Sequence, residues 1–296
     1  MQKILEIQQL TKHYGRIKAV HNLSIDVEKG QVFGILGPNG SGKTTTLSII
    51  MGIIHQQSGS FSWFGSSSGS SVWKKNVGSL IEVPNFYPYL SLENNLKIIA
   101  VIKDVSAGDT DRVLKITGLY ERKHYPYSTM SLGMKQRLAM ASVLLGDPEV
   151  MVLDEPTNGL DPEGIAEVRS IIRGEAVKGK TVILASHILA EVEKVCTHVA
   201  VLKGGELMAA GRVDELLGGD QVFLISAPSV GLLEEPLVRA GIAKTTEIKG
   251  DDLVITCDLS TRASDINEFA FKHDIVLSKL VPVKKSLESQ FLELVR

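Results

Sequence analysis

The chain has 296 residues, enough for one large domain or two and for a substantial buried core. Hydrophobic residues make up 44% and charged residues 22%, and the net charge of −2 argues against generic nucleic-acid binding. No apolar run is long enough to span a bilayer, and the first residues lack the apolar centre of a signal peptide. Cys196 and Cys257 are isolated and fit buried reduced thiols rather than a metal site or a disulfide framework. We therefore expect a cytoplasmic protein that reaches a membrane only through a partner.

A glycine-rich turn lies between the apolar strand predicted at 32–36 and the helix that follows residue 44, and it matches the P-loop pattern G-x-x-x-x-G-K-[ST] in full. Such a turn directs backbone N–H groups at phosphate oxygens, and the helix N-terminus adds positive potential. Lys43 can reach the β- and γ-phosphates, and the Thr44 hydroxyl can ligand Mg²⁺. The residues expected to bind the nucleoside triphosphate are Gly37, Pro38, Asn39, Gly40, Ser41, Gly42, Lys43, Thr44 and Thr45. A chance lysine in an ordinary glycine-rich turn is the alternative, and the strand and helix on either side argue against it.

Beyond the P-loop, a short strand and a serine-rich solvated loop are expected at 58–71. From about Ser91 to Leu145 apolar residues recur with helical spacing, beginning with Leu92 and Leu96. Two fully apolar strands follow, at 150–153 and 181–185. Strands that alternate with helices after a P-loop predict an α/β P-loop NTPase, with its site at the carboxyl ends of the strands. We assign residues 1–218 to this domain, with a helical subdomain at about 84–145.

The composition changes near Leu217 and Asp220, which predicts a second domain over 219–296. Its elements follow the order βαββαβ, which predicts a small α+β ferredoxin-like fold. The predicted strands cover 221–226, 243–248, 253–258 and 275–281, and the predicted helices cover 230–240 and 263–273. A last amphipathic helix is expected to contain Leu287 and Val295. No triphosphate chemistry is visible in this region, so packing or dimerisation is favoured over effector binding, and a regulatory role stays open.

Two acids end the apolar strand at 150–153, and a histidine follows the strand at 181–185. Asp154 stands where a Walker B aspartate holds Mg²⁺, and Glu155 can orient the attacking water and accept its proton. His187 is expected beside the same site, although a lone histidine is more often a packing residue. A polar strand end without chemistry is the alternative for the two acids, and the P-loop argues against it.

Two further motifs give the chain a specific family resemblance. After the P-loop come S-L-G-M-K-Q-R at 131–137 and L-D-E-P-T-N-G-L-D-P at 153–162, followed by His187, and in this order they resemble the ATPase subunit of an ABC transporter. The resemblance covers about residues 4–211. Within that family the chain is similar to the ABC-2 type drug- and peptide-export ATPases, especially the bacitracin and lantibiotic self-resistance group, through residues 78–88 and 286–294.

The resemblance implies roles for individual residues beyond the P-loop and implies ATP and Mg²⁺ as ligands. Tyr14 would stack on adenine, and an ordinary strand-end aromatic is the alternative. Ser131 and Gly133, at the start of a helix predicted from Met134 to Leu145, would bind the γ-phosphate of ATP held by a second chain. Asp161 would communicate across that dimer, and the catalytic residues would be Glu155 as base and the γ-phosphate-sensing His187.

The chain departs from the family pattern in two places. Residues 130–134 read M-S-L-G-M where the family signature reads L-S-G-G-Q, which keeps the serine and the second glycine. Glu82 stands where a glutamine is expected. A carboxylate there can ligand Mg²⁺ or its water alongside Thr44 and Asp154, but it adds negative charge beside the phosphates and cannot donate a hydrogen bond. This departure falls in the loop through which the resemblance implies coupling of the nucleotide to a membrane partner.

The function implied by the resemblance is that of an ATP-hydrolysing exporter subunit. ATP-driven closure of two chains, either two copies or one copy with a related ATPase, would power a separate membrane-spanning permease that exports an antimicrobial peptide or drug. The chain would then lie on the inner face of the membrane, and no nucleic-acid partner is expected. An ABC-type ATPase acting on nucleic acid or ribosomes is the alternative, but the sequence has neither a long coiled coil nor a second cassette. A GTPase would need an Asn-Lys-x-Asp motif, which the sequence lacks.

Overall fold

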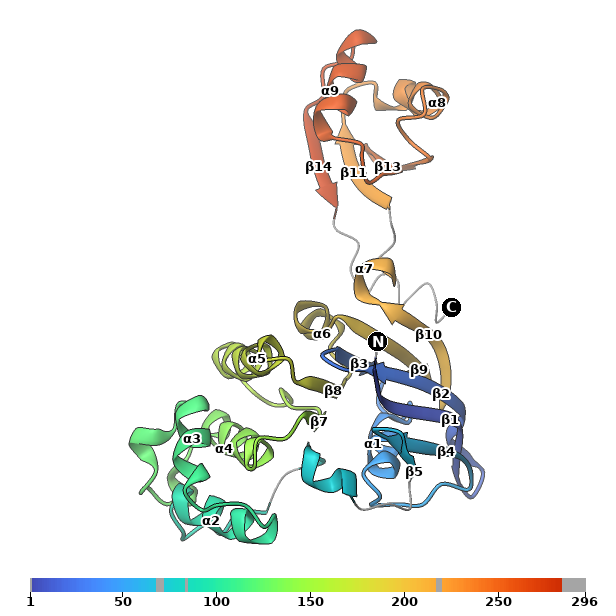
Figure 1. Ribbon diagram of the computed structural model, residues 1–296. Coiled ribbons are helices and arrows are strands. Elements are labelled where there is room, and N and C mark those ends of the chain that lie inside the picture. Colours follow the sequence, from blue (N-terminus) through green and yellow to red (C-terminus); the bar gives the residue numbers. More distant parts are fainter. Residues whose placement is uncertain (1, 68–71, 83–84, 217–219, 284–296) are drawn as a thin grey trace. The chain divides into compact units, whose positions relative to one another are not determined.

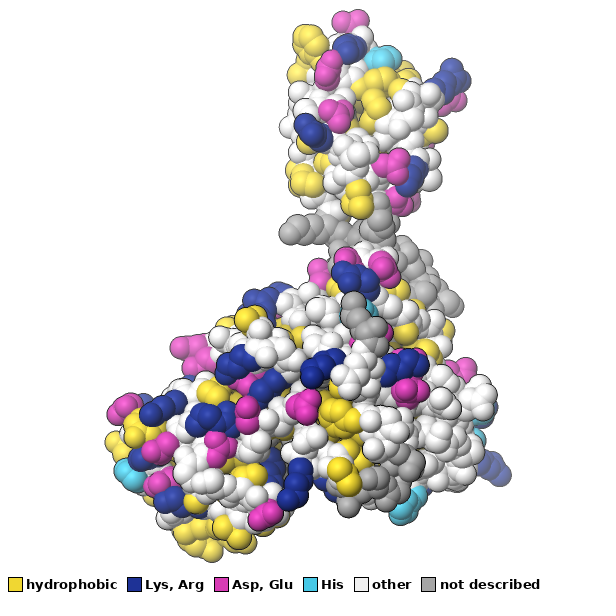
Figure 2. Space-filling view, in the orientation of Figure 1, with side chains coloured by type: hydrophobic (Ala, Val, Ile, Leu, Met, Phe, Trp, Pro, Cys, Tyr) yellow, Lys and Arg dark blue, Asp and Glu magenta, His cyan; other side chains and the backbone are white. Residues whose placement is uncertain are grey.

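The computed structural model describes residues 2–67, 72–82, 85–216 and 220–283 (Figure 1). It divides into two compact units, with the boundary between Arg212 and Val213, whereas the sequence predicts a change of domain after residue 218. Acidic and basic side chains are intermixed over the visible face of each unit (Figure 2), as the small net charge suggests. Cys196 and Cys257 are both buried and unpaired.

A six-stranded sheet organises the first unit, and its order is β10-β9-β3-β8-β7-β6. The strands are β3 (Val32–Leu36), β6 (Val77–Leu80), β7 (Val150–Asp154), β8 (Thr181–Ser186), β9 (His198–Lys203) and β10 (Glu206–Arg212). All pairs are parallel except β9 with β10. Strands β3, β7 and β8 are buried along their whole length, as expected for central parallel strands. Leu36 pairs with Ser186 and Asp154 with Ala185, so the carboxyl ends of these strands lie level.

A second sheet in this unit is antiparallel, in the order β2-β1-β4-β5. Its strands are β1 (Lys3–Tyr14), β2 (Ile17–Glu28), β4 (Ser58–Trp63) and β5 (Ser66–Ser67). Apolar residues from both sheets join one core with helix α1 (Lys43–Ile50), which contributes Leu47, Ile49 and Ile50. The Trp63 indole, fully buried, donates a 2.8 Å hydrogen bond to the Ile50 carbonyl and so ties β4 to the end of α1. The helix that carries the P-loop is therefore packed against both sheets.

Helices and short 3₁₀ turns fill the rest of this unit. The helices are α2 (Leu92–Ile102), α3 (Asp109–Ile116), α4 (Leu132–Leu144), α5 (Pro162–Val177) and α6 (Leu189–Val195), and the 3₁₀ turns are η1 (Val72–Asn76), η2 (Tyr120–Arg122) and η3 (Tyr127–Thr129). Three of these helices begin at a side chain that accepts a backbone N–H, as N-cap residues do, namely Ser91, Ser131 and Asp161. Helix α4 therefore starts at Leu132 rather than at the predicted Met134, because the Ser131 cap satisfies the first turn.

The second unit contains one antiparallel sheet in the order β12-β13-β11-β14. Its elements are α7 (Val213–Leu216), β11 (Asp220–Ser226), η4 (Val230–Leu233), α8 (Glu234–Arg239), β12 (Thr245–Lys249), β13 (Asp252–Asp258), α9 (Ala263–Lys272) and β14 (Lys279–Val283). Alternate residues of the central strands, such as Phe223 and Ile255, join a core with Leu237 of α8 and Ile266 of α9. The strand order and the two helices confirm the predicted ferredoxin-like arrangement.

Element boundaries in this unit differ from the predicted ones. The predicted helix at 230–240 is a 3₁₀ turn followed by α8, in which Pro236 occupies the first turn, where a missing N–H is tolerated. The predicted last strand starts later, because Ile275 and Leu277 pack against the core before the chain enters β14. Among the described strands, β14 pairs only with β11 and so can contain Pro282, as edge strands do. The predicted helix from Leu287 lies outside the described residues.

Candidate active site

The P-loop joins β3 to α1 through three glycines that have positive φ angles, Gly37 (154°), Gly40 (79°) and Gly42 (103°). A Cβ atom on Gly42 would lie 2.1 Å from the Ala19 carbonyl oxygen. The backbone of β2, which contains Ala19, therefore passes too close to the turn to leave room for a side chain at this position. At Gly42 both the left-handed backbone and the contact require glycine.

Lys43 is held inside this turn. Its side chain is 5% exposed, and its ammonium donates hydrogen bonds to the carbonyls of Gly37 (2.9 Å) and Pro38 (3.2 Å). The Lys43 Nζ atom lies 3.4 Å from Oε1 of Glu155. A buried ammonium needs such partners because desolvation of an isolated charge is costly. The positive charge is therefore fixed between the P-loop and Glu155, which directly follows β7.

Asp154 ends β7 and is 9% exposed. Burial raises the pKa of this carboxyl above its ordinary value, the negative charges of Glu155 and Glu82 raise it further, and the Thr44 hydroxyl and Lys43 oppose them. Oδ1 of Asp154 is buried without a hydrogen-bond partner among the described residues. A buried carboxylate oxygen with spare acceptor capacity next to a threonine hydroxyl fits Mg²⁺, which takes oxygen ligands and neutralises such a charge.

Glu155 and His187 meet at the ends of β7 and β8. Nδ1 of His187 lies 2.9 Å from Oε2 of Glu155, and the His187 backbone N–H points at the same oxygen at 3.4 Å. An ionised carboxylate only accepts hydrogen bonds, so Nδ1 carries the proton in this contact. The pair places a carboxylate that can accept a proton beside an imidazole that orients it, with Lys43 on the other carboxylate oxygen.

A cavity of about 290 Å³ opens beside the P-loop. Its lining consists of Tyr14, Ile17, Ala19, Asn39, Gly40, Gly42, Lys43, Thr44, Thr45 and Glu155. Tyr14 ends β1 and is 49% exposed, with the Lys12 ammonium 5.4 Å from its ring centre. An aromatic face at the rim of a phosphate-binding turn is placed where a base could stack.

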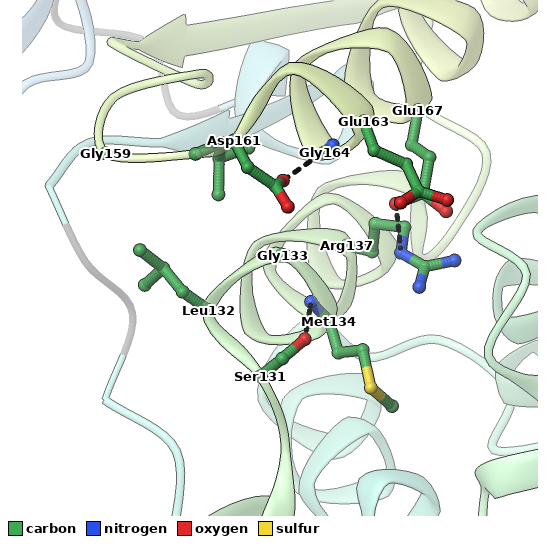
Figure 3. A pocket seen from close by; sticks show the side chains of 11 residues that line it. Ser131, Leu132, Gly133, Met134, Arg137, Gly159, Asp161, Glu163, Gly164 and Glu167 are labelled. Atoms are coloured by element: carbon green, nitrogen blue, oxygen red, sulfur yellow. Dashed lines mark hydrogen bonds and ion pairs between the residues drawn. The ribbon is translucent and has the colours of Figure 1, made fainter.

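A second cavity, of about 420 Å³, lies between the N-termini of α4 and α5 (Figure 3). Ser131 and Gly133 line it together with Asp161. The Ser131 hydroxyl accepts the Met134 N–H at 3.3 Å, and the Asp161 carboxylate accepts the Gly164 N–H at 2.9 Å, so each caps its own helix. None of the P-loop residues lines this cavity.

The predicted site residues therefore form two groups. Lys43, Thr44, Asp154, Glu155 and His187 converge, and the charge of Glu82 acts on Asp154. Ser131, Gly133 and Asp161 form the other group. They line the second cavity, and none of them lines the P-loop cavity of the same chain.

Sequence reasoning missed two side chains that hold these groups in place. Arg137 pairs with Glu167 of α5, with Nε and Oε2 3.2 Å apart, which joins α4 to α5 beside the second cavity (Figure 3). Gln136 donates to the Pro156 carbonyl at 2.7 Å, directly after Glu155. Both belong to the S-L-G-M-K-Q-R motif, but nothing in the sequence indicates which backbone or side chain each would meet.

The glycine turn after β3, the buried aspartate at the end of β7 and the lysine and histidine around Glu155 define a P-loop nucleoside triphosphatase. Residues 20–158 match the ABC transporter family. The bacitracin transport ATP-binding protein BcrA of Enterococcus faecalis is 31% identical over 299 residues, covering 100% of this chain and 97% of its own. The lantibiotic transport ATP-binding protein SrtF of Streptococcus pyogenes is 37% identical over 220 residues, covering 74% of this chain and 96% of its own.

Solved structures agree with this assignment. The structure of cbiO1 from Clostridium perfringens, part of the ABC transporter complex cbiONQ, has a TM-score of 0.66 at 26% identity, covering 81% of this chain and 96% of its own. The chain therefore belongs to the ATP-binding proteins of ABC transporters, and it is an ATPase subunit whose hydrolysis is coupled to transport. The predicted P-loop NTPase fold is confirmed. None of the helices in the described part of the chain has both the length and the apolar character needed to cross a bilayer.

Proposed function

We propose that this chain hydrolyses ATP with Glu155 as the general base, and that closure of two such chains around ATP drives a separate membrane permease. The observation that carries the proposal is the arrangement around Glu155. Its Oε1 atom lies 3.4 Å from the Lys43 ammonium, and its Oε2 atom lies 2.9 Å from Nδ1 of His187. A carboxylate held between a phosphate-binding lysine and an orienting histidine is placed to accept a proton from attacking water.

The other residues of the cavity support binding and orientation. The backbone N–H groups of the P-loop and the N-terminus of α1 would hold the phosphates, while Tyr14 would stack on the adenine. Thr44 and Asp154, with Glu82 nearby, would hold Mg²⁺, which neutralises charge on the β- and γ-phosphates when bound. His187 would sense the γ-phosphate and keep the Glu155 carboxylate directed at the water.

The second cavity supports a two-chain assembly. Ser131 and Gly133 present a hydroxyl and the N-terminus of α4, an arrangement that suits an anion, yet the cavity contains none of the P-loop residues. A γ-phosphate bound there would belong to the nucleotide of another chain, either a second copy or a related ATPase. Asp161, on the same cavity, would face that chain and report its state.

The relatives support the transport role and the cargo class. BcrA and SrtF are named for the transport of bacitracin and of a lantibiotic, and both align with most of this chain. We therefore infer that the permease exports an antimicrobial peptide or drug and holds this chain at the inner face of the membrane. A permease gene next to the gene for this chain, and a loss of resistance to such peptides when both are deleted, would support that cargo. Unchanged susceptibility would count against it.

The decisive experiment on the chemistry is the substitution Glu155→Gln. Loss of the proton acceptor should lower kcat by about 10²- to 10⁴-fold, while ATP still binds and a nucleotide-bound dimer accumulates. Phosphate release and size-exclusion chromatography with Mg-ATP measure the two effects. Glu247→Gln, in an exposed part of the second unit, is the matched control. A Glu155→Gln variant that turns over ATP at the wild-type rate would show that the base assignment is wrong.

A further inference from the structure

The backbone at Glu155 is strained. Its φ angle is +46°, in the left-handed region that side-chain-bearing residues seldom occupy. The next residue is Pro156, and a residue before proline favours extended conformations instead. Strained backbone of this kind persists only where surrounding contacts hold it, and it is often found at functional sites.

Three hydrogen bonds hold the turn at Glu155. Its own N–H donates to the Ala185 carbonyl of β8 at 3.0 Å, and its carbonyl accepts the Asn158 N–H at 3.1 Å. The third bond comes from a side chain, because Nε2 of Gln136 donates to the Pro156 carbonyl at 2.7 Å. Pro156 is buried and Gln136 is half-buried, so this contact is partly shielded from water. Of these three bonds, only the third has its donor in α4.

Gln136 lies little more than one turn along α4 from Ser131, the residue that caps this helix. The same helix therefore presents its N-terminus to the second cavity and extends a side chain to the turn that carries Glu155. Helices transmit small displacements along their length as rigid bodies. A shift of α4 would thus reach the Pro156 carbonyl through one short hydrogen bond.

We propose that Gln136 is a positioning residue that couples the two ATP sites of the dimer. This inference rests on the proposed function, in which Ser131 and Gly133 bind the γ-phosphate of the partner chain's ATP. When that phosphate engages the N-terminus of α4, Gln136 holds the Pro156 carbonyl and keeps Glu155 in its strained conformation, directed at the water beside the chain's own ATP. Without this bond the turn relaxes and Glu155 loses its alignment.

The substitution Gln136→Glu tests this role, because it keeps the shape of the side chain but removes the N–H donor and sets a carboxylate against a carbonyl. We expect kcat to fall by about tenfold to a hundredfold, as for a catalytic group displaced by an ångström. Affinity for a non-hydrolysable ATP analogue should stay within about twofold, since the P-loop is untouched. Gln221→Glu is the matched control, because Gln221 also donates to a backbone carbonyl, that of Leu259, at 3.0 Å in the second unit. Unchanged kcat in Gln136→Glu, or an equal loss of analogue affinity, overturns the proposal.

A mixed dimer separates coupling from a merely structural effect on α4. If Gln136 acts on Glu155 of its own chain, Gln136→Glu in one chain and Ser131→Ala in the other damage the same ATP site and leave the other site working. Both substitutions in one chain then damage both sites, and kcat falls to about a tenth of the wild-type value or less. If Gln136 only supports the N-terminus of α4, the outcomes reverse, and that reversal, or equal activity in the two arrangements, overturns the proposal.

Two further measurements keep the test interpretable. Should Gln136→Glu fail to fold, as judged by thermal unfolding, Gln136→Met provides a neutral side chain of similar length that also lacks the donor. It should show the same loss of kcat, and wild-type kcat in this variant contradicts the coupling. Absence of hydrolysis by the wild-type chain and its dimer would instead refute the proposed function, so the two failures can be told apart.

Discussion

The N-termini of α1 and α4 both offer backbone N–H groups to an anion, but in different settings. The start of α1 is enclosed, with Lys43 5% exposed and a Cβ on Gly42 excluded by the Ala19 carbonyl. The start of α4 is open, since Ser131 is exposed and Leu132 is 58% exposed. The α1 end also has a lysine inside the turn itself, held by the Gly37 and Pro38 carbonyls and by Glu155, whereas the arginine near α4, Arg137, pairs with Glu167 beside the second cavity.

This difference indicates what each end can do alone. Electrostatic attraction from a helix N-terminus is modest in an exposed position and grows when the site is enclosed and carries a cation. The α1 end can therefore bind a triphosphate within one chain. The cavity at the N-terminus of α4 also contains the carboxylates of Asp161 and Glu163, which repel an anion. A phosphate is therefore expected there only when a partner chain brings it and closes over the site.

The largest expected effect removes the cation from the enclosed end. Lys43→Ala should weaken Mg-ATP binding by about a hundredfold or more, because the charge-assisted hydrogen bonds to phosphate are lost and Glu155 loses one of its two partners. Isothermal titration calorimetry measures the affinity. Lys249→Ala, in an exposed part of the second unit, is the control. Near-normal binding by Lys43→Ala would mean that the backbone turn alone holds the nucleotide.

A smaller effect is expected at the open end. Ser131→Ala removes a cap and a hydroxyl from α4 and should lower kcat by about tenfold through a weaker two-chain site. Mg-ATP binding to the single chain should not change, because the P-loop cavity does not include Ser131. Comparison of single-chain affinity with steady-state hydrolysis measures both. Equal loss in the two assays would contradict the division between the two ends. Ser91→Ala, which removes the cap of α2, controls for helix stability.

A third prediction concerns the negative charge of Glu82 and its effect on Asp154, near the N-terminus of α1. The Glu82 charge helps to raise the pKa of Asp154, and in the proposed site Asp154 must be ionised to hold Mg²⁺, so activity should be lost as pH falls through that pKa. Glu82→Gln removes this charge and should move the acid limb of the kcat/KM profile to lower pH. The profile is measured at saturating Mg²⁺, with Glu247→Gln as control. A shift to higher pH would show that Glu82 acts chiefly as a metal ligand.

The smallest effect concerns how the far end of α4 is anchored. The Lys103 ammonium donates to the Ser142 carbonyl in the last turn of α4 at 2.7 Å, and burial lowers the pKa of Lys103 from 10.5 to about 8. Between about pH 8 and 10.5 the unfolded chain binds more protons than the folded chain, so the free energy of unfolding rises with pH across this window. Wild type should therefore gain about 2 kcal/mol relative to Lys103→Met from pH 7.5 to 9.5.

Denaturant unfolding at the two pH values measures that difference. Lys97→Met is the matched control, because Lys97 pairs with Glu93 on α2 near the surface. A pH-independent difference between wild type and Lys103→Met would show that Lys103 stays charged in the folded protein.

Features encoded locally could be predicted from the sequence. The P-loop is continuous in the chain, and the acids at the end of β7 and His187 after β8 come together because parallel strands end at one edge. The βαββαβ order of the second unit was likewise readable from hydrophobic periodicity, although β14 starts several residues later than predicted, because Ile275 and Leu277 pack on the core outside any strand.

Features that depend on tertiary contacts could not be predicted. The left-handed backbone of Glu155 and the bond from Gln136 to the Pro156 carbonyl arise from packing of α4 against the turn after β7. No local propensity favours positive φ at a glutamate before proline. The cation–carbonyl contact of Lys103 is of the same kind, since its partner lies on a different helix.

The strand order also has a consequence for biosynthesis. Strand β3, which leads into the P-loop, pairs with β8 and β9 and with no strand close to it in the chain. During synthesis Lys43 emerges before Asp154 and His187, by roughly five seconds or more at ordinary elongation rates. Central pairings between such distant segments form late in folding. The nascent chain therefore becomes able to bind a nucleotide only after most of the first unit has been synthesised. Until then the glycine turn lacks β8, β9 and the residues after β7.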